Sequence, residues 1–407
     1  MLRANAIVGQ SGGPTSAINA TLSGVIKACL GNKERINTLY GVKNGIEGLL
    51  KDDIIELSGM FCDRNKLKRL EATPSSALGS CRMRLPESFN DIVYRRIFDI
   101  FKKYGIGYFF YIGGNDSMDT VSKLDKYART CGYGIRIIGI PKTIDNDLTE
   151  TDHTPGYGSA AKYIATTVSE ILRDCASYTV KAVTVIEIMG RDAGWLTCAA
   201  SLPKAVIGEG VDLIYLPERT FSMDKFISSV NKALERHPNV VIAVSEGIRY
   251  ENGAYVGELE QSGNKDVFGH KYLAGVSKVL SRAISENIGC KVRAIELNLL
   301  QRCAAHLQSA VDISESIRIG KAAVERALKG ESGRMISLER RKGKYSVRIK
   351  SVDIDAVANK VRYVPCSFIN KDGNYVTKEC IEYLLPLVLG ETKKEYKNGL
   401  PVYCIIK

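Results

Sequence analysis

The amino-acid sequence predicts a doubly wound α/β fold in a chain of 407 residues. Short apolar runs alternate with amphipathic stretches, which is the strand–helix order of folds built on parallel sheets. Several runs are almost wholly apolar, as parallel strands are when helices cover both faces of their sheet. The length predicts two or three domains with ample material for hydrophobic cores.

The composition narrows the class of protein. Hydrophobic residues make up 45% and charged residues 25%, which is typical of a soluble globular protein. No apolar run approaches the roughly 18 residues of a membrane span, and the N-terminus lacks a signal-like stretch, so we expect a cytoplasmic protein without a membrane partner. Eleven cysteines without a CxxC pair, and four histidines without ligand spacing, favour reduced thiols over disulfides or a zinc site.

The net charge of +12 first suggests a nucleic-acid partner. The basic residues are dispersed, however, and "LERRKGKYSVRIK" at 338–350 is the only dense cluster. A solvated face explains that cluster, and dispersed positive charge also suits small polyanions such as phosphorylated metabolites. We therefore expect no nucleic-acid partner.

The first strand, in "NAIVGQSGG", leads through Gly12 and Gly13 to a helix expected to begin near Ser16. The glycines fit a phosphate cradle of backbone N–H groups, or simply a tight strand-to-helix turn. The next run, "YFFYIGG", leads through Asn115 and Asp116 to a helix expected from Ser117. Apolar residues at helical spacing in "DTVSKLDKYA" support that helix.

The strand "RIIGIP" is followed by Lys142, Thr143, Asp145 and Asp147. Two carboxylates this close push their proton affinities apart, so that one serves as a base and the other tunes it or holds a metal. Lys142 offers a compact positive charge for phosphate. The alternative is a capped turn with solvated acids.

Later strands also end in polar groups. Met189, Gly190 and Arg191 follow the run "VTVIEI", and Glu246 follows the run "VVIAVS". A further strand is expected at "DLIYLPE". An arginine there suits phosphate recognition or is a surface residue, and Glu246 could hold a sugar hydroxyl or cap the next element. Ligands of open α/β sheets lie outside the carboxyl ends of the strands, so a single crevice is expected.

The stretches "SGG", "GSCR", "GGNDS", "PKTIDNDL", "MGRDAGWL" and "VSEG" occur in an order and spacing that resembles the phosphofructokinase family, over roughly residues 4–310. The resemblance implies phosphoryl transfer to the 1-hydroxyl of fructose 6-phosphate with Mg²⁺ as cofactor. It also implies two Rossmann-like lobes with the active site in a cleft between them. On this basis we expect a donor-binding lobe at 1–150, completed by about 292–330, a sugar-phosphate lobe at 151–291, and a C-terminal extension at 331–407.

The resemblance also implies roles for single residues. Asp145 matches the general base that takes the proton of the sugar hydroxyl, and Asp147 matches its supporting carboxylate. The remaining matches contact the two substrates: Thr143, Met189, Gly190, Arg191 and Glu246 for the sugar phosphate, Arg293 and Arg302 for its 6-phosphate, and Gly13 and Arg82 for the donor phosphates.

The chain departs from the family pattern at three places. Asn115 stands where the family has a metal-supporting Asp, so magnesium would meet a neutral oxygen there. Leu299 replaces an aromatic residue or His, which weakens the placement of the sugar around 299–302. Ala182 replaces a basic residue that some members lend to a neighbouring subunit, which leaves completion of the site across subunits open. A homo-oligomer is expected, with a homodimer favoured.

Asp116 and Lys142 bear on the phosphoryl donor. Both stand where ATP-using members have glycine, and both match the pyrophosphate-dependent members. An Asp fills the space of the α-phosphate and repels it by about 4 kcal/mol at about 4 Å and an effective dielectric near 20, which is about a thousandfold in binding. Lys142 can neutralise charge on the departing phosphate. The sequence thus predicts reversible transfer from pyrophosphate in glycolysis or gluconeogenesis.

Three alternatives stay open. Asp116 could simply cap the helix that follows it. The protein could be an ATP-dependent sugar-phosphate kinase, against which Asp116 and Lys142 count. It could also be a non-catalytic, metabolite-binding regulatory subunit, although a pure sensor has no need of Asp145 and Asp147.

Overall fold

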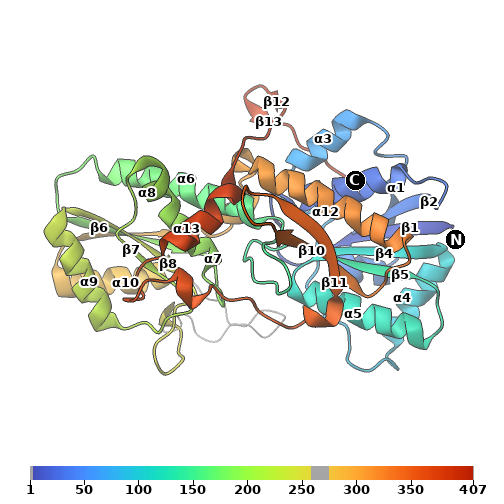
Figure 1. The fold of residues 1–407 in the computed structure, drawn as a ribbon, viewed down its shortest axis with the longest axis horizontal. Coiled ribbons are helices and arrows are strands. Elements are labelled where there is room, and N and C mark those ends of the chain that lie inside the picture. The colour runs from blue at the N-terminus through green and yellow to red at the C-terminus, as the bar shows by residue number, and fades with distance from the viewer. Residues whose placement is uncertain (1–2, 258–274, 407) are drawn as a thin grey trace.

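The computed structural model describes residues 3–257 and 275–406 and contains two α/β lobes side by side (Figure 1). The first lobe is built on a seven-stranded sheet of order β11-β10-β5-β4-β1-β2-β3. Its inner strands pair in parallel, whereas β3 and β11 pair antiparallel at the two edges. The strands are β1 (Ala4–Gln10), β2 (Ile36–Val42), β3 (Ile54–Glu56), β4 (Ile106–Gly113), β5 (Arg136–Pro141), β10 (Arg334–Arg340) and β11 (Val347–Asp353).

Helices cover both faces of the first sheet, and apolar side chains fill the space between. The central strand β4 is buried at every position, as its apolar run predicts. One face carries α1 (Ile18–Leu30), α3 (Arg64–Ala72) and α12 (Ala310–Leu328), and the other carries α2 (Gly45–Leu50), α4 (Ile92–Lys103) and α5 (Asn115–Thr130). The doubly wound α/β fold is confirmed.

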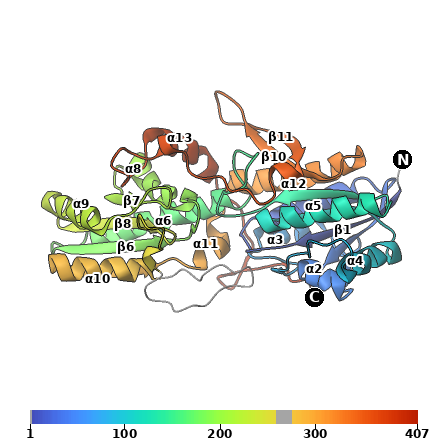
Figure 2. The same ribbon diagram turned by 90° about the horizontal axis from the view of Figure 1, so that it is seen from below.

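The second lobe repeats this architecture on a smaller, all-parallel sheet of order β7-β8-β6-β9 (Figures 1 and 2; Figure 2 shows α10 and α9 lying along the sheet). Its strands are β6 (Ala182–Ile188), β7 (Leu213–Tyr215), β8 (Asn239–Ser245) and β9 (Lys291–Glu296). One face packs on α6 (Tyr157–Cys175), α7 (Trp195–Cys198), η1 (Ala199–Ser201), α8 (Leu202–Ile207) and α13 (Lys378–Leu384), the other on α9 (Met223–Arg236) and α10 (Val276–Ile288).

The expected return of the chain to the first lobe at about 292 is wrong. Strand β9 pairs in parallel with β6, with Thr184 opposite Arg293, and so belongs to the second sheet. After β9 come the short helices α11 (Leu300–Cys303) and η3 (Ala305–Leu307), and the first lobe resumes with α12, which packs on α1. Strand β9 is a partly exposed edge strand, which is why its sequence lacks an apolar run.

The region from 331 onward joins both lobes instead of forming a separate unit. Strand β10 extends the first sheet beside β5, and β11 forms its edge. The chain then crosses through η4 (Ile354–Ala356) and η5 (Cys366–Phe368) to α13 and η6 (Leu385–Val388) on the second lobe (Figure 1). It ends in the short hairpin of β12 (Tyr396–Lys397) and β13 (Leu400–Pro401).

Two helices begin at residues other than those predicted. Helix α1 begins at Ile18, two residues after Ser16, and the Thr15 hydroxyl accepts the N–H groups of Ala17 and Ile18 just before it. Helix α5 begins at Asn115 and not at Ser117. Residue 116 therefore lies inside the first helical turn.

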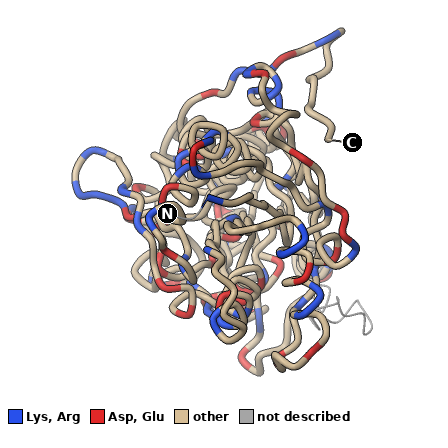
Figure 3. Tube along the Cα trace, turned by 90° about the vertical axis from the view of Figure 1, so that its right-hand side faces the viewer, with Lys and Arg blue, Asp and Glu red and all other residues tan. Residues whose placement is uncertain are grey.

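The distribution of charge, the apolar length of the helices and the state of the cysteines can each be compared with the expectations from sequence. Figure 3 shows Lys and Arg residues interspersed with Asp and Glu along the described chain. Within residues 3–257 and 275–406, no helix is long and apolar enough to cross a membrane. All eleven cysteines are free thiols, as the scattered spacing predicted.

Candidate active site

Asp145 and Asp147 lie on the loop after β5, on either side of Asn146, which has a left-handed backbone (φ 54°). The Thr143 hydroxyl donates to Asp145 Oδ2 at 3.3 Å. Burial raises the pKa of Asp145, although the Thr143 hydrogen bond and the charge of Arg191 act in the opposite direction. Burial and then the charge of Asp145 raise the pKa of Asp147 to about 7. Asp147 therefore titrates near neutral pH, so the two carboxylates together carry less than two full negative charges there.

Lys142 lies under this loop as a buried cation. Its side chain is only 2% exposed, and Nζ donates to the carbonyl oxygen of Gly13 at 2.6 Å. Burial lowers the pKa of Lys142 to about 8, opposed by the negative charge of Asp145. The amino group is thus mainly charged at pH 7 and loses its charge at mildly alkaline pH.

The glycines after β1 leave room for two cationic side chains. Gly12 has a left-handed backbone (φ 74°), and a Cβ there would lie 3.4 Å from Lys142 Nζ. A Cβ at Gly13 would lie 3.2 Å from Arg302 Nη1. Since Arg302 follows the second sheet in α11 and Gly13 follows the first, this contact joins the two lobes.

The polar ends of β6 and β8 meet on the opposite side of the junction. The N–H of Gly190 donates to Glu246 Oε1 at 3.3 Å, and the hydroxyl of Ser245 donates to the carbonyl of Gly190 at 2.5 Å. Met189 donates its N–H to Gln301 Oε1 at 3.1 Å. Burial raises the pKa of Glu246 to about 7, so this group also titrates near neutral pH.

Gly190 can only be a glycine in this conformation. Its φ is 140°, and a Cβ would lie 2.6 Å from the carbonyl oxygen of Ala193. The next residue, Arg191, donates from Nε to Asp192 Oδ2 at 3.1 Å and acts electrostatically on Asp145. The segment after β6 therefore faces the carboxylate loop after β5.

Arg82 and Arg302 add positive charge to the same place. Burial, and then repulsion from Arg82, lower the pKa of Arg302, while Asp145 and Glu246 act in the opposite direction. Cations and acids from both lobes thus gather at one junction, as the strand-end argument predicted. The residues brought together are Gly13, Arg82, Lys142, Thr143, Asp145, Asp147, Met189, Gly190, Arg191, Glu246 and Arg302.

Arg293 does not join this group within the chain. It lies in the middle of β9 opposite Thr184, while the site lies beyond the carboxyl end of β6 at Ile188. Its guanidinium carbon is 5.6 Å from the ring centroid of Tyr178, which precedes β6. The family resemblance paired Arg293 with Arg302 at the 6-phosphate, but within one chain Arg293 lies in β9, away from Arg302.

Asp116 makes an ion pair and does not cap its helix. Its Oδ1 accepts hydrogen bonds from Arg84 Nε at 3.2 Å and Nη2 at 2.9 Å. The N-cap position of α5 is Gly114, and no side chain bonds there. The alternative that Asp116 caps the helix is therefore excluded, and Arg84 is a neighbour that the motifs did not single out.

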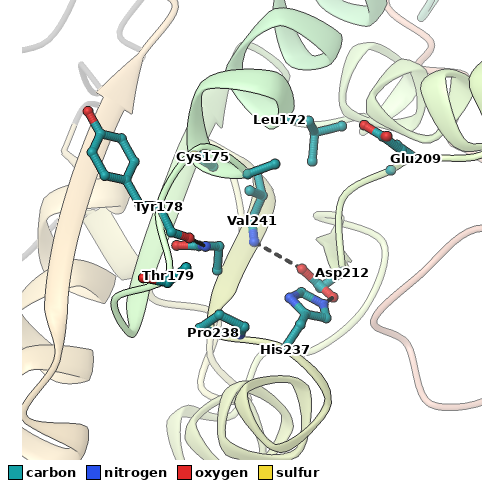
Figure 4. Close-up of a pocket in the computed structure, with 12 residues that line it drawn as sticks. Leu172, Cys175, Tyr178, Thr179, Glu209, Asp212, His237, Pro238 and Val241 are labelled. Atoms are coloured by element: carbon teal, nitrogen blue, oxygen red, sulfur yellow. Dashed lines mark hydrogen bonds and ion pairs between the residues drawn. The ribbon is translucent and has the colours of Figure 1, made fainter.

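A cavity of about 410 Å³ lies elsewhere, at the amino ends of β6 and β8 (Figure 4). Its lining includes Cys175, Tyr178, Asp212 and His237. Asp212 accepts a hydrogen bond from the Val241 N–H at 3.0 Å and lies 2.8 Å from His237 Nε2. These groups bond among themselves at the end of the sheet remote from the carboxylate loop.

Comparison with known proteins decides the family. Residues 5–327 match the family described as Phosphofructokinase. The chain belongs to the phosphofructokinase family. The motifs that surround the junction of the lobes are therefore those of an established enzyme family.

Two full-length relatives carry a pyrophosphate-dependent name, and a third carries an ATP-dependent one. A Methylococcus capsulatus protein named pyrophosphate–fructose 6-phosphate 1-phosphotransferase is 40% identical, over 99% of this chain and 96% of its own. A crystal structure of a pyrophosphate-dependent phosphofructokinase from Nitrosospira multiformis is 37% identical with a TM-score of 0.89, over 98% of this chain and 96% of its own. A Streptomyces coelicolor relative named ATP-dependent 6-phosphofructokinase 3 is 28% identical, over 91% of this chain and 98% of its own.

The junction of this phosphofructokinase fits Mg²⁺, which the family implies. Mg²⁺ usually takes one or two carboxylates and completes its shell with water and substrate phosphates. Asp147 offers a carboxylate whose pKa is raised by burial and then by the negative charge of Asp145, and a bound cation would counter both effects. Asn115 Oδ1 already accepts the Asn359 N–H at 2.6 Å, so it has only one lone pair left for a metal or its water.

Proposed function

We propose that the protein transfers a phosphoryl group from pyrophosphate to the 1-hydroxyl of D-fructose 6-phosphate, giving fructose 1,6-bisphosphate and orthophosphate, reversibly and with Mg²⁺. The observation that carries the donor is the pair Lys142 and Asp116. Lys142 is a buried cation beside the glycine loop, and Asp116 is held by Arg84 in the first turn of α5. We assign Asp116 to the exclusion of the α-phosphate of ATP, and Lys142 to neutralising charge on the departing phosphate.

Asp145 is the proposed base. It accepts the proton of the sugar 1-hydroxyl while that oxygen forms a bond to the terminal phosphorus of pyrophosphate. The bridging P–O bond breaks, and its electron pair leaves with orthophosphate. Lys142 lies where its charge can stabilise the negative charge that develops on the leaving group. Because burial raises the pKa of Asp145, the forward rate should fall as the medium becomes acidic.

The other side chains bind and orient. Gly13 and Arg82 suit the donor phosphates, and Arg302, whose guanidinium lies near Gly13, suits the 6-phosphate of the sugar. Thr143, Met189, Gly190 and Arg191 suit the sugar phosphate, and Glu246 its hydroxyls. Mg²⁺, when bound, neutralises phosphate charge, and Asp147 would hold it, with Asn115 at most in a supporting place.

We further propose a cytoplasmic homo-oligomer, most simply a homodimer. The free thiols suit a reducing compartment. Strand β9 is an open sheet edge, and the nearby Tyr178 and Val180 are 51% and 65% exposed. An open edge with exposed apolar neighbours is a surface on which a second copy can pair, and Arg293 lies on it.

The test supplies fructose 6-phosphate and Mg²⁺ with either pyrophosphate or ATP, and measures fructose 1,6-bisphosphate. Product from pyrophosphate alone supports the proposal. Product from ATP alone would establish the kinase alternative, and sugar-phosphate binding without product from either donor would establish a regulatory subunit.

A further inference from the structure

Asn146 holds the turn between the two carboxylates of the active-site loop. It is fully buried and has a left-handed backbone. Its Oδ1 accepts the N–H of Thr154 at 3.1 Å, which closes the loop on itself, and its Nδ2 donates to the hydroxyl of Tyr383 at 3.0 Å. The positions of Asp145 and Asp147 therefore depend on what holds Asn146.

Tyr383 comes from α13, 237 residues further along the chain. Its hydroxyl donates to the carbonyl oxygen of Asp152 at 2.7 Å, and accepts from Asn146 and from Arg362 Nη2, the latter at 3.2 Å. One donated and two accepted bonds are all that a hydroxyl can make. The Tyr383 hydroxyl thus ties both ends of the loop to the C-terminal segment.

Arg362 holds the other side of the same turn. Its backbone N–H donates to the carbonyl oxygen of Asp147 at 2.8 Å, and its guanidinium carbon lies 4.3 Å from the ring centroid of Trp195. Trp195 in turn donates its indole N–H to the carbonyl of Arg362 at 3.0 Å. Trp195 begins α7, directly after the Gly190–Arg191 segment, so Arg362 connects the carboxylate loop to the sugar-phosphate side.

We propose that the C-terminal segment positions the catalytic carboxylates, with Tyr383 and Arg362 as positioning residues. The segment crosses from the first lobe to the second, and Tyr383 and Arg362 are its residues that bond to the Asn146–Asp147 turn between the carboxylates. Arg340 and Tyr345, also on this segment, anchor it around Asp152, His153 and Glu315 without contacting Asn146. The inference rests on the proposed function, because it concerns the same carboxylates.

The test compares Tyr383→Phe with Tyr345→Phe. Each variant removes one hydroxyl from the C-terminal segment, but the Tyr345 hydroxyl donates to Glu315 Oε1 at 2.9 Å and does not bond to Asn146. We expect similar losses of melting temperature. Only Tyr383→Phe should lower kcat, by about 10- to 100-fold, with both KM values within about threefold, because small misplacement of reacting groups acts on the chemical step.

A second variant, Asn146→Gly, keeps a backbone that tolerates φ 54° but removes the same bond from the other side. Asn146→Gly also loses the bonds that Asn146 Oδ1 accepts from Thr154 and Arg362, so its kcat loss should be at least as large as that of Tyr383→Phe. Adding Tyr383→Phe to it should lower kcat much less than Tyr383→Phe does alone, because their shared contact is already gone. The single variant Asn146→Gly also tests the proposal if Tyr383→Phe does not fold. A kcat of Asn146→Gly within twofold of wild type would then overturn the proposal.

Equal kcat losses in Tyr383→Phe and Tyr345→Phe would overturn the proposal as well, since the segment would then act through stability alone. All variants are assayed with both pyrophosphate and ATP. If wild type uses only ATP, the proposed donor is wrong, whereas the ratio between the two tyrosine variants still tests positioning.

Discussion

Replacing Asp116 by glycine should let ATP serve as a donor. At about 4 Å a carboxylate repels a phosphate charge by about 4 kcal/mol at an effective dielectric of 20, and by about 1 kcal/mol in bulk water. The Asp116 side chain is 39% exposed, so an intermediate value of about 2 kcal/mol is appropriate. This corresponds to a gain of about 30-fold in kcat/KM for ATP. Asp116→Asn, which keeps the volume, separates the contribution of charge from that of space.

The assay is steady-state kinetics of each variant with ATP and with pyrophosphate. Asp119→Asn is the matched control, because Asp119 lies on the same helix but pairs with Lys123 at 2.9 Å. It removes one negative charge and should leave donor preference unchanged. If Asp116→Gly merely lowers the melting temperature and the ratio of ATP to pyrophosphate efficiency stays as in wild type, the electrostatic reasoning about this loop is refuted.

Three further outcomes are expected. Asp145→Ser should lower kcat by about 10²- to 10⁴-fold with little change in the KM for fructose 6-phosphate, and near-normal turnover would remove Asp145 from the role of base. Lys142 has a pKa lowered to about 8, so pyrophosphate turnover should fall as pH rises through 8. Lys142→Met should show a low rate without this alkaline decline and no gain with ATP. An unchanged alkaline decline in Lys142→Met would assign the decline to another group. Asp147 has a pKa raised to about 7, so protons should compete with Mg²⁺ for its carboxylate. The Mg²⁺ concentration for half-maximal rate should therefore rise below pH 7. In Asp147→Asn this pH dependence should disappear, and its persistence would place the metal elsewhere.

The strands that the sequence predicts well are those buried on both faces. The runs at 108–114, 136–142 and 183–188 are apolar because helices cover them on either side, and they appear as β4, β5 and β6. Strand β9 was missed because it lies at a sheet edge and four of its six residues are only partly buried. An apolar sequence pattern cannot reveal a strand that is not buried. Because β9 was missed, the return of the chain to the first lobe was predicted too early, at about 292.

Some residues of the candidate site could also be predicted from the sequence, and others could not. Asp145, Gly190 and Glu246 could be predicted because each follows a strand, and the carboxyl ends of parallel strands share one edge. The pair of Asp116 with Arg84 and the bond of Asn146 to Tyr383 could not, since both depend on tertiary contacts between segments far apart in the chain. Arg293, which the family resemblance assigned to the 6-phosphate, lies within β9 and does not reach the site of its own chain.

The most direct measurement offers the enzyme both donors at once. Fructose 6-phosphate and Mg²⁺ are incubated with equal concentrations of pyrophosphate and ATP, and phosphorus NMR follows each donor in the same tube. We predict that pyrophosphate is consumed in step with formation of fructose 1,6-bisphosphate, and that added orthophosphate and fructose 1,6-bisphosphate regenerate pyrophosphate. Consumption of ATP, with pyrophosphate left intact while the bisphosphate forms, would contradict the account.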